Sequence, residues 1–121
     1  MTAEVLTKSK ERIKDLGEVF TPTELVLEML DELPKEMWTD GKTFLDPTCG
    51  NGQFLVQVIL RKIELGHSET LSCIYGADIM ADNVAECKER LLAIGGNTQH
   101  NREILNTNIV CEDGLTYDYS F

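Results

Sequence analysis

The sequence predicts an α/β fold in which a partial parallel sheet of about three strands is flanked by helices. Segments with a 3.6-residue apolar period alternate along the chain with short strand-like runs, and each run ends at an aspartate. Consecutive strands that are separated by helices are joined by crossovers and therefore run parallel. The length of 121 residues fits one domain, which we place at residues 17–121.

The first predicted helix begins at a Thr-Pro pair. Thr21 and, three residues later, Glu24 match a capping box, with Pro22 at the first helical position. Apolar residues at helical spacing continue to Leu33. The preceding residues, 1–16, are charged with a weak helical period, and we expect a helical arm or a tail there.

The first strand is predicted at Thr43–Asp46 and runs into a turn that contains two glycines. The helical period returns at Gln53, and Gly66 is expected to end that helix. A second strand is predicted at Leu71–Ala77, with Asp78 directly after it. This order places a glycine turn between the first strand and its helix.

The last third of the chain is predicted to hold one helix and one strand. The helix covers Asp82–Ile94, with Asp82 itself as the N-cap. Residues Asn97–Asn108 are polar and are interpreted as a loop. The third strand is expected at Ile109–Glu112, followed by Asp113.

The charge of the chain restricts its partners. Eleven basic and 21 acidic residues give a net charge of −10. Nucleic-acid binders gain much of their affinity by neutralising phosphates with basic side chains, so this chain alone is a poor candidate for tight DNA or RNA binding. A cationic small molecule or a basic partner protein suits it better.

The sequence also favours a cytoplasmic location. No apolar run approaches the roughly 18 residues of a membrane-spanning helix, and the N-terminal residues lack the apolar stretch of a secretory signal. The four cysteines include no C-x-x-C pair, so we expect free thiols in a reducing compartment rather than disulfides or a zinc site.

Aspartates end all three predicted strands, and in parallel sheets ligands bind at the carboxyl ends of strands. Asp46 would attract an ammonium group, Asp78 would accept hydrogen bonds from ribose hydroxyls, and Asp113 would accept one from an exocyclic amine. The alternatives are an ordinary tight turn, a cap beside a helix and a solvated turn aspartate, respectively. S-adenosylmethionine (AdoMet) carries all three of these groups and no pyrophosphate.

The segment Asp46–Leu55, Asp-Pro-Thr-Cys-Gly-Asn-Gly-Gln-Phe-Leu, resembles the AdoMet-binding motif of N6-adenine DNA methyltransferases. Gly17–Thr23 resembles the N-terminal motif of the gamma group and of restriction-modification M subunits. Gly76–Ile79 and Glu112–Gly114 fall where the ribose and adenine motifs of that family fall. The resemblance implies a Rossmann-like AdoMet-dependent methyltransferase fold and AdoMet as cofactor.

The resemblance also assigns individual residues to parts of the cofactor. Three residues of the N-terminal motif would close over the methionine end, and four residues of the glycine loop would line it. The others would hold the ribose, the adenine ring and the adenine amine. In chain order these expected site residues are Phe20, Thr21, Pro22, Asp46, Thr48, Gly50, Gly52, Asp78, Ile79 and Asp113.

The catalytic motif Asn-Pro-Pro-Tyr/Phe is absent from this sequence, because its three prolines are never adjacent. The leading hypothesis is therefore the AdoMet-binding portion of an adenine-specific DNA methyltransferase, truncated or dependent on a partner for catalysis. The alternative is a stand-alone, non-catalytic AdoMet-binding protein derived from a methyltransferase. An enzyme that consumes AdoMet in another way is a third possibility, whereas a dinucleotide oxidoreductase would need a third glycine.

A three-stranded sheet would leave one edge of the strand at Thr43–Asp46 unpaired, since the methyltransferase sheet places its first strand in the middle. Open strand edges invite pairing with another chain. We therefore expect a homodimer or a partner protein, with DNA contacted only indirectly through that partner.

Overall fold

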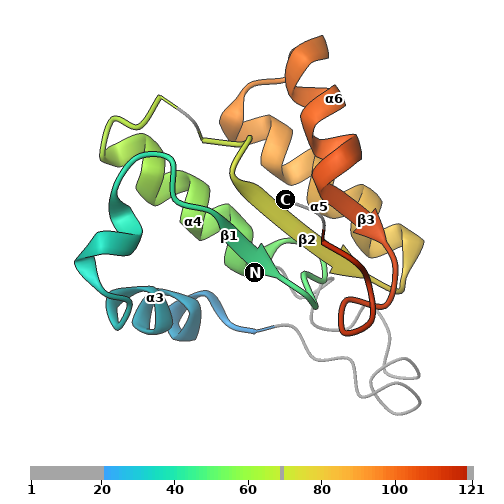
Figure 1. Ribbon diagram of the computed structural model, residues 1–121, viewed down its shortest axis with the longest axis horizontal. Helices are drawn as coiled ribbons and strands as arrows, with labels where there is room; N and C mark the ends of the chain where they lie inside the picture. Colours follow the sequence, from blue (N-terminus) through green and yellow to red (C-terminus); the bar gives the residue numbers. More distant parts are fainter. Residues whose placement is uncertain (1–20, 69, 120–121) are drawn as a thin grey trace.

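A computed structural model describes residues 21–68 and 70–119 of the chain (Figure 1). The expected arm at residues 1–16 lies outside this part. The elements, in chain order, are α3 (Thr23–Asp31), the 3-10 helix η1 (Lys35–Trp38), β1 (Phe44–Asp46), α4 (Gln53–Glu64), β2 (Ile74–Asp78), α5 (Ala81–Gly95), α6 (Gln99–Asn108) and β3 (Ile109–Cys111).

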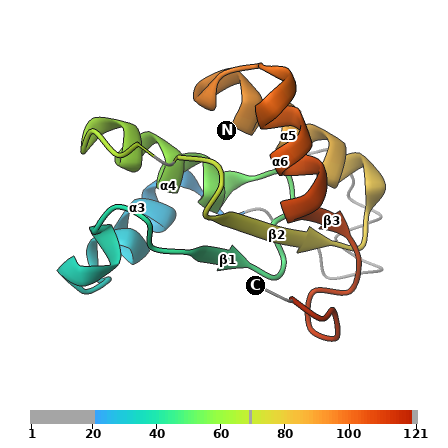
Figure 2. The ribbon, with the colours of Figure 1, turned by 45° about the horizontal axis from the view of Figure 1, so that its top comes forward.

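The three strands form one parallel sheet in the order β1-β2-β3, which confirms the predicted α/β class. Asp46 pairs with Gly76, and Asp78 pairs with Cys111. Figure 2 shows the strands running in the same direction, so their carboxyl ends meet at one edge of the sheet.

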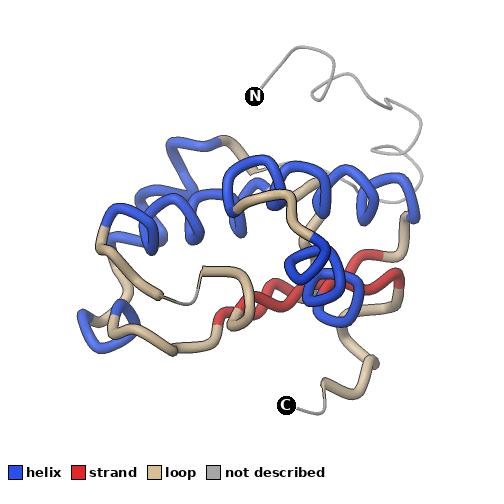
Figure 3. Tube along the Cα trace, turned by 90° about the horizontal axis from the view of Figure 1, so that it is seen from above, coloured by secondary structure: helices blue, strands red, loops and turns tan. Residues whose placement is uncertain are grey.

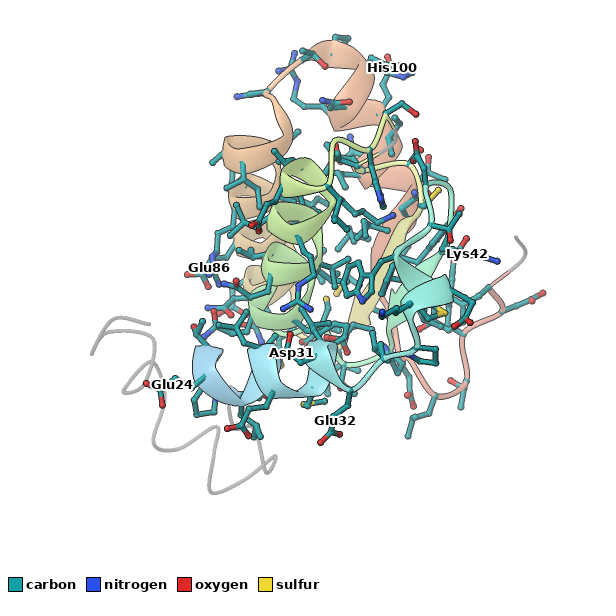
Figure 4. The ribbon with its side chains drawn as sticks, turned by 90° about the vertical axis from the view of Figure 1, so that its left-hand side faces the viewer. Glu24, Asp31, Glu32, Lys42, Glu86 and His100 are labelled. Carbon is teal, nitrogen blue, oxygen red and sulfur yellow. The ribbon has the colours of Figure 1, made fainter. Side chains whose placement is uncertain are left out.

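Helices α4 and α5 form a layer on one side of the strands, and α3 packs against α4 (Figure 3). Asp31 of α3, labelled in Figure 4, forms an ion pair with Arg61 of α4 at 2.9 Å. The core between helices and sheet is built from aliphatic side chains that are fully enclosed, among them Val26, Leu30, Leu55, Val58, Ile59, Ile74, Leu91, Leu105 and Ile109.

The opposite face of the sheet is less covered. Leu45, Tyr75 and Val110 alternate with buried strand residues and so project from this face, because successive side chains of a strand point to opposite sides. Leu45 is 37% exposed, and the other two are half-buried. No other strand among residues 21–68 and 70–119 pairs with the free edge of β1.

Two predicted helix caps were wrong. Helix α3 begins at Thr23 with Pro22 as its N-cap, and no side chain caps it. The carbonyl of Pro22 accepts the first helical hydrogen bond, from the amide of Val26, so Thr21 is too far back to form the predicted capping box. The N-cap of α5 is Met80 instead of Asp82, because the Met80 carbonyl accepts the first helical hydrogen bond, from the amide of Val84.

The predicted loop at Asn97–Asn108 was also wrong, because residues Gln99–Asn108 form helix α6. The side chain of Thr98 caps this helix by accepting a hydrogen bond from the Asn101 amide at 3.1 Å. Only Ile104 and Leu105 supply apolar packing, with Leu105 fully buried. A helix with one turn of apolar contact gives too weak a period to be recognised from sequence.

The predicted strands were close in position, but the second one began later than expected. Leu71 lies in a turn that the Ile74 amide closes by donating to the Leu71 carbonyl at 3.1 Å. Strand β2 therefore starts at Ile74 and includes Asp78 as its last residue. The side chain of Leu71 is nevertheless buried in the core, which explains its strand-like apolar character.

Candidate functional site

The loop after β1 continues the hydrogen-bonding pattern of the sheet before it turns into α4. The amide of Thr48 donates to the carboxylate of Asp46 at 3.1 Å, and the amide of Cys49 donates to the carbonyl of Ala77 in β2 at 2.8 Å. The side chain of Thr48 is exposed, and that of Asp46 is half-buried. The loop is thus fixed to the ends of both strands.

Two glycines make the turn into α4 possible. Gly50 has a φ of 53° and Gly52 a φ of 96°, a left-handed region that other residues rarely adopt. A Cβ on Gly52 would also lie 3.0 Å from the Sγ atom of Cys87. Gly52 is the N-cap of α4, and the dipole at the start of a helix favours negative groups of a ligand.

Two buried cysteines, one within this turn and one packed against it, belong to its core side. Cys49 and Cys87 are 3% and 0% exposed, and both are free thiols. Hydrogen bonding between the two side chains, and then burial, raises the pKa of the Cys49 thiol. A thiol of this kind stays protonated at neutral pH, so Cys49 serves packing rather than nucleophilic chemistry.

Asp78 links the first two strand ends. Its carboxylate accepts hydrogen bonds from the amides of Gly50 at 3.1 Å and Met80 at 2.8 Å, and from the side chain of Asn83 at 3.4 Å. These contacts place Asp78 beside the start of α5. They agree with the alternative interpretation of Asp78, in which it is a cap beside a helix. The same contacts hold its carboxylate at the glycine loop, 28 residues away in the chain.

The carboxylates of Asp46 and Asp78 interact across this edge. The pKa of Asp46 is raised above its ordinary value of 3.8, first by burial and further by the negative charge of Asp78. Hydrogen bonds from Thr48 partly oppose the increase. Two nearby carboxylates with incomplete solvation favour a cation between them or a proton on one of them.

The segment that follows β3 contacts the loop that follows β1. Asp113 begins a turn in which its carboxylate accepts from the Leu115 amide at 3.0 Å and its carbonyl from the Tyr117 amide at 2.9 Å. Gly114 lies so close to the Pro47 carbonyl that any Cβ would overlap it. Asp113 is exposed, which agrees with its alternative interpretation as a solvated turn aspartate. Its turn nevertheless contacts the loop after β1 through Gly114 and Pro47.

Tyr119 is a residue of this edge that the sequence interpretation missed. Its hydroxyl donates to the Gly114 carbonyl at 3.0 Å, and its ring meets that of Tyr117 edge to face at 5.0 Å. Burial is the main cause that raises the pKa of Tyr119, with smaller contributions from neighbours that include Asp46 and Asp113. The recurrence of tyrosines shortly after an Asp-Gly turn was the available sequence signal.

The remaining expected residues differ in how the structure places them. The Thr21 carbonyl accepts a hydrogen bond from the side chain of Gln53 at 3.4 Å, which brings the Thr-Pro segment to the start of α4. Ile79 is 60% exposed at the end of β2, and its carbonyl accepts from the Cys111 thiol at 3.6 Å. Pro22 is exposed, and Phe20 lies outside the described residues.

The edge therefore gathers Asp46, Asp78 and the Asp113 turn around one glycine loop. This arrangement offers a suitable set of groups for a cationic nucleoside: an exposed aliphatic side chain, backbone amides at a helix start and several carboxylates. Within residues 21–68 and 70–119, no group of three or more His, Cys, Asp or Glu side chains could hold a metal ion. The same part of the chain contains no helix that could span a membrane.

Comparison with known proteins agrees with this arrangement. Residues 4–120 match the sequence model of a family described as N-6 DNA Methylase. The chain belongs to this family. The match extends over all three strands and the glycine loop, and the α/β architecture fits the family's Rossmann-like methyltransferase fold.

A curated relative of this chain is the Type II methyltransferase M.VspI of Vibrio sp. (strain 343). The two proteins are 32% identical over 87 residues, which cover 72% of this chain but 19% of the relative. The chain thus spans about a fifth of the length of that methyltransferase. No solved structure matches the chain.

Proposed function

We propose that this chain is the AdoMet-binding portion of an adenine-specific (N6) DNA methyltransferase of a restriction-modification type. The observation that carries the proposal is the hydrogen bond from the Gly50 amide to the Asp78 carboxylate, which connects the glycine loop to the acidic end of β2. Family membership and the named Type II relative support methyl transfer to DNA as the activity of the complete system.

In this proposal each part of the site at the carboxyl ends of the strands contacts a different part of AdoMet. Asp46, Thr48, Gly50 and Gly52 line the methionine end, where the negative charge of the neighbouring Asp78, one cause of the raised pKa of Asp46, also favours the ammonium group. Asp78 and Ile79 hold the ribose and the adenine ring. Asp113 accepts from the adenine amine, while Phe20, Thr21 and Pro22 close the methionine end.

Catalysis in this proposal requires polypeptide beyond this sequence, because no Asn-Pro-Pro motif is present to position the target amine. The net charge of −10 is consistent with DNA contacts that lie elsewhere. The protein works in the cytoplasm, where the four free thiols would remain reduced.

The free edge of β1 and the half-covered sheet face at Leu45 are the surfaces that such a polypeptide would bury. Parallel sheets are normally covered on both faces. We propose a partner protein that adds a strand to β1 and carries the catalytic motif. A second copy of the chain could cover the same edge and form a homodimer. Light scattering at tens of micromolar tests this: a dimer would show pairing between copies, and a monodisperse monomer would count against it.

Calorimetry tests the central step. Titration of the chain with AdoMet and with S-adenosylhomocysteine should give heat of binding at one site. The absence of heat with both ligands would refute the proposal.

The absence of Asn-Pro-Pro also favours a second candidate, a stand-alone AdoMet-binding protein that does not catalyse methyl transfer. Both candidates predict AdoMet binding. Incubation of the chain alone with tritiated AdoMet and unmethylated DNA should give no labelled DNA in either case. Addition of a polypeptide that co-purifies with the chain should give labelled DNA only if the chain is the methyltransferase portion. Incorporation by the chain alone would refute both, and mass spectrometry of the products would reveal any other consumption of AdoMet.

A further inference from the structure

A chain of hydrogen bonds connects α5 to the Thr-Pro segment through the start of α4. The Nη1 atom of Arg90 donates to the Oε1 atom of Gln53 at 2.9 Å and to the carbonyl of Asn51 at 3.1 Å. The Nε2 atom of Gln53 donates in turn to the carbonyl of Thr21 at 3.4 Å. These contacts join segments that are 37, 39 and 32 residues apart in sequence.

Gln53 is suited to the middle of this connection because its amide accepts at one atom and donates at the other. The residue is 7% exposed, so water cannot readily replace a lost partner. A glutamate at this position would keep an acceptor for Arg90 but would turn an oxygen toward the Thr21 carbonyl. The two halves of the connection can therefore be separated by one substitution.

The loop residue Asn51 shows that this connection acts on the main chain. Its carbonyl accepts the hydrogen bond from Arg90, while neither polar atom of its own buried side chain has a hydrogen-bond partner among residues 21–68 and 70–119. The side chain of Asn51 thus does not fasten the loop. Arg90 on α5 supplies the fixed hydrogen bond to this part of the glycine turn instead.

We propose that Gln53 and Arg90 are positioning residues that hold the Thr21–Pro22 segment against the glycine loop, at the methionine end of the cofactor site. This inference rests on the proposed function. Gln53 lies within the Asp46–Leu55 segment but has no role assigned to it there, and Arg90 lies outside all of the motifs. The end of the connection is a main-chain carbonyl just before α3, so its role extends beyond fastening α4 to α5.

The test compares Gln53→Glu with Gln57→Glu, the same substitution one turn later on α4, where no hydrogen bond of the connection is made. Hydrogen–deuterium exchange of the ligand-free protein is measured for the peptide that covers residues 21–26. Binding of S-adenosylhomocysteine and of 5′-methylthioadenosine, which lacks the amino-acid end, is measured by calorimetry. Arg90→Gln and Arg90→Lys form a second pair.

We expect Gln53→Glu to raise exchange in residues 21–26 and to weaken S-adenosylhomocysteine by roughly fivefold, the effect of one net hydrogen bond. Affinity for 5′-methylthioadenosine should not change. Arg90→Gln should act likewise, and Arg90→Lys should restore part of the loss because an ammonium can still donate to both acceptors.

Equal behaviour of Gln53→Glu and Gln57→Glu would overturn the proposal, as would an equal loss for both ligands. If the unsubstituted protein binds neither ligand, the proposed function fails. In that case the exchange comparison alone decides whether Gln53 positions the Thr21 segment: faster exchange in Gln53→Glu supports it, and no difference overturns it.

Discussion

The carboxylate of Asp78 accepts a hydrogen bond from the amide of Gly50 at 3.1 Å, which ties the end of the second strand to the turn after the first. Its other oxygen accepts from the Met80 amide at 2.8 Å. One acidic side chain thus fixes the glycine turn and the approach to α5. Any ligand of this edge would meet a preformed loop.

Replacement of Asp78 by asparagine should lower both stability and cofactor affinity. An amide nitrogen would face one of the backbone donors, so we expect a loss of about 1–3 kcal/mol in the free energy of unfolding. S-adenosylhomocysteine affinity should fall at least about tenfold, since a tenfold loss needs only about 1.4 kcal/mol. Urea unfolding and calorimetry measure the two effects. Asp118→Asn, at an exposed position, is the charge-matched control and should change neither.

Replacement of Asn51 by leucine should stabilise the ligand-free chain. The side-chain amide of Asn51 is fully buried, and neither of its polar atoms has a partner in the described part of the chain, so an apolar side chain of similar size removes a desolvation cost of about 1–3 kcal/mol. The matched control is Asn83→Leu. Asn83 is equally buried but donates to Asp78, so its replacement should destabilise the protein. Urea denaturation compares them, and a lower stability of Asn51→Leu would contradict the expectation.

Replacement of Gly114 by alanine should dislodge the Asp113 turn, because the added Cβ would overlap the Pro47 carbonyl. We expect a loss of at least about 2 kcal/mol, in the upper range for overpacked sites. Gly41→Ala provides the contrast: Gly41 has a φ of 91° but open space around its Cβ position, so only a backbone cost of about 1–2 kcal/mol is expected. Thermal unfolding compares the variants, and a smaller effect at Gly114 would disprove the close approach.

The raised pKa of Asp46 predicts a pH-dependent penalty. Because burial and the charge of Asp78 raise this pKa in the folded state, the folded protein binds the proton more tightly than the unfolded chain. The contribution of Asp46 to stability therefore decreases as the pH rises from its ordinary value of 3.8 through the folded pKa, and then stays constant.

Asp46→Asn removes this titration and keeps an acceptor for the Thr48 amide. The variant should be more stable than the unsubstituted chain at pH 7, and the difference should shrink as the pH falls toward 4. Urea unfolding at several pH values measures the difference. A variant that is less stable at pH 7, or a difference that grows toward acid, would contradict the assigned cause.

Much of the fold could be predicted because its signals are local. The alternation of apolar periods located α4, α5 and all three strands, and Gly66, with a φ of 77°, follows α4 where it was expected to end it. Helix α6 was missed because its stability depends on Leu105 packing into a core made by distant residues. The caps of α3 and α5 were misplaced for a different reason: the first helical hydrogen bonds are accepted by the carbonyls of Pro22 and Met80, and cap residues alone did not reveal at which residue each helix begins.

The sequence by itself determined the class of fold, the glycine turn and the position of an aspartate at each strand end, because backbone preferences and apolar periods act between near neighbours. Only the tertiary structure decided that Gly114 meets Pro47 and that Gln53 reaches Thr21. These contacts link residues whose approach depends on how strands and helices pack. A local sequence pattern cannot specify these contacts, because the separation of the two residues depends on how all the helices and strands between them are arranged.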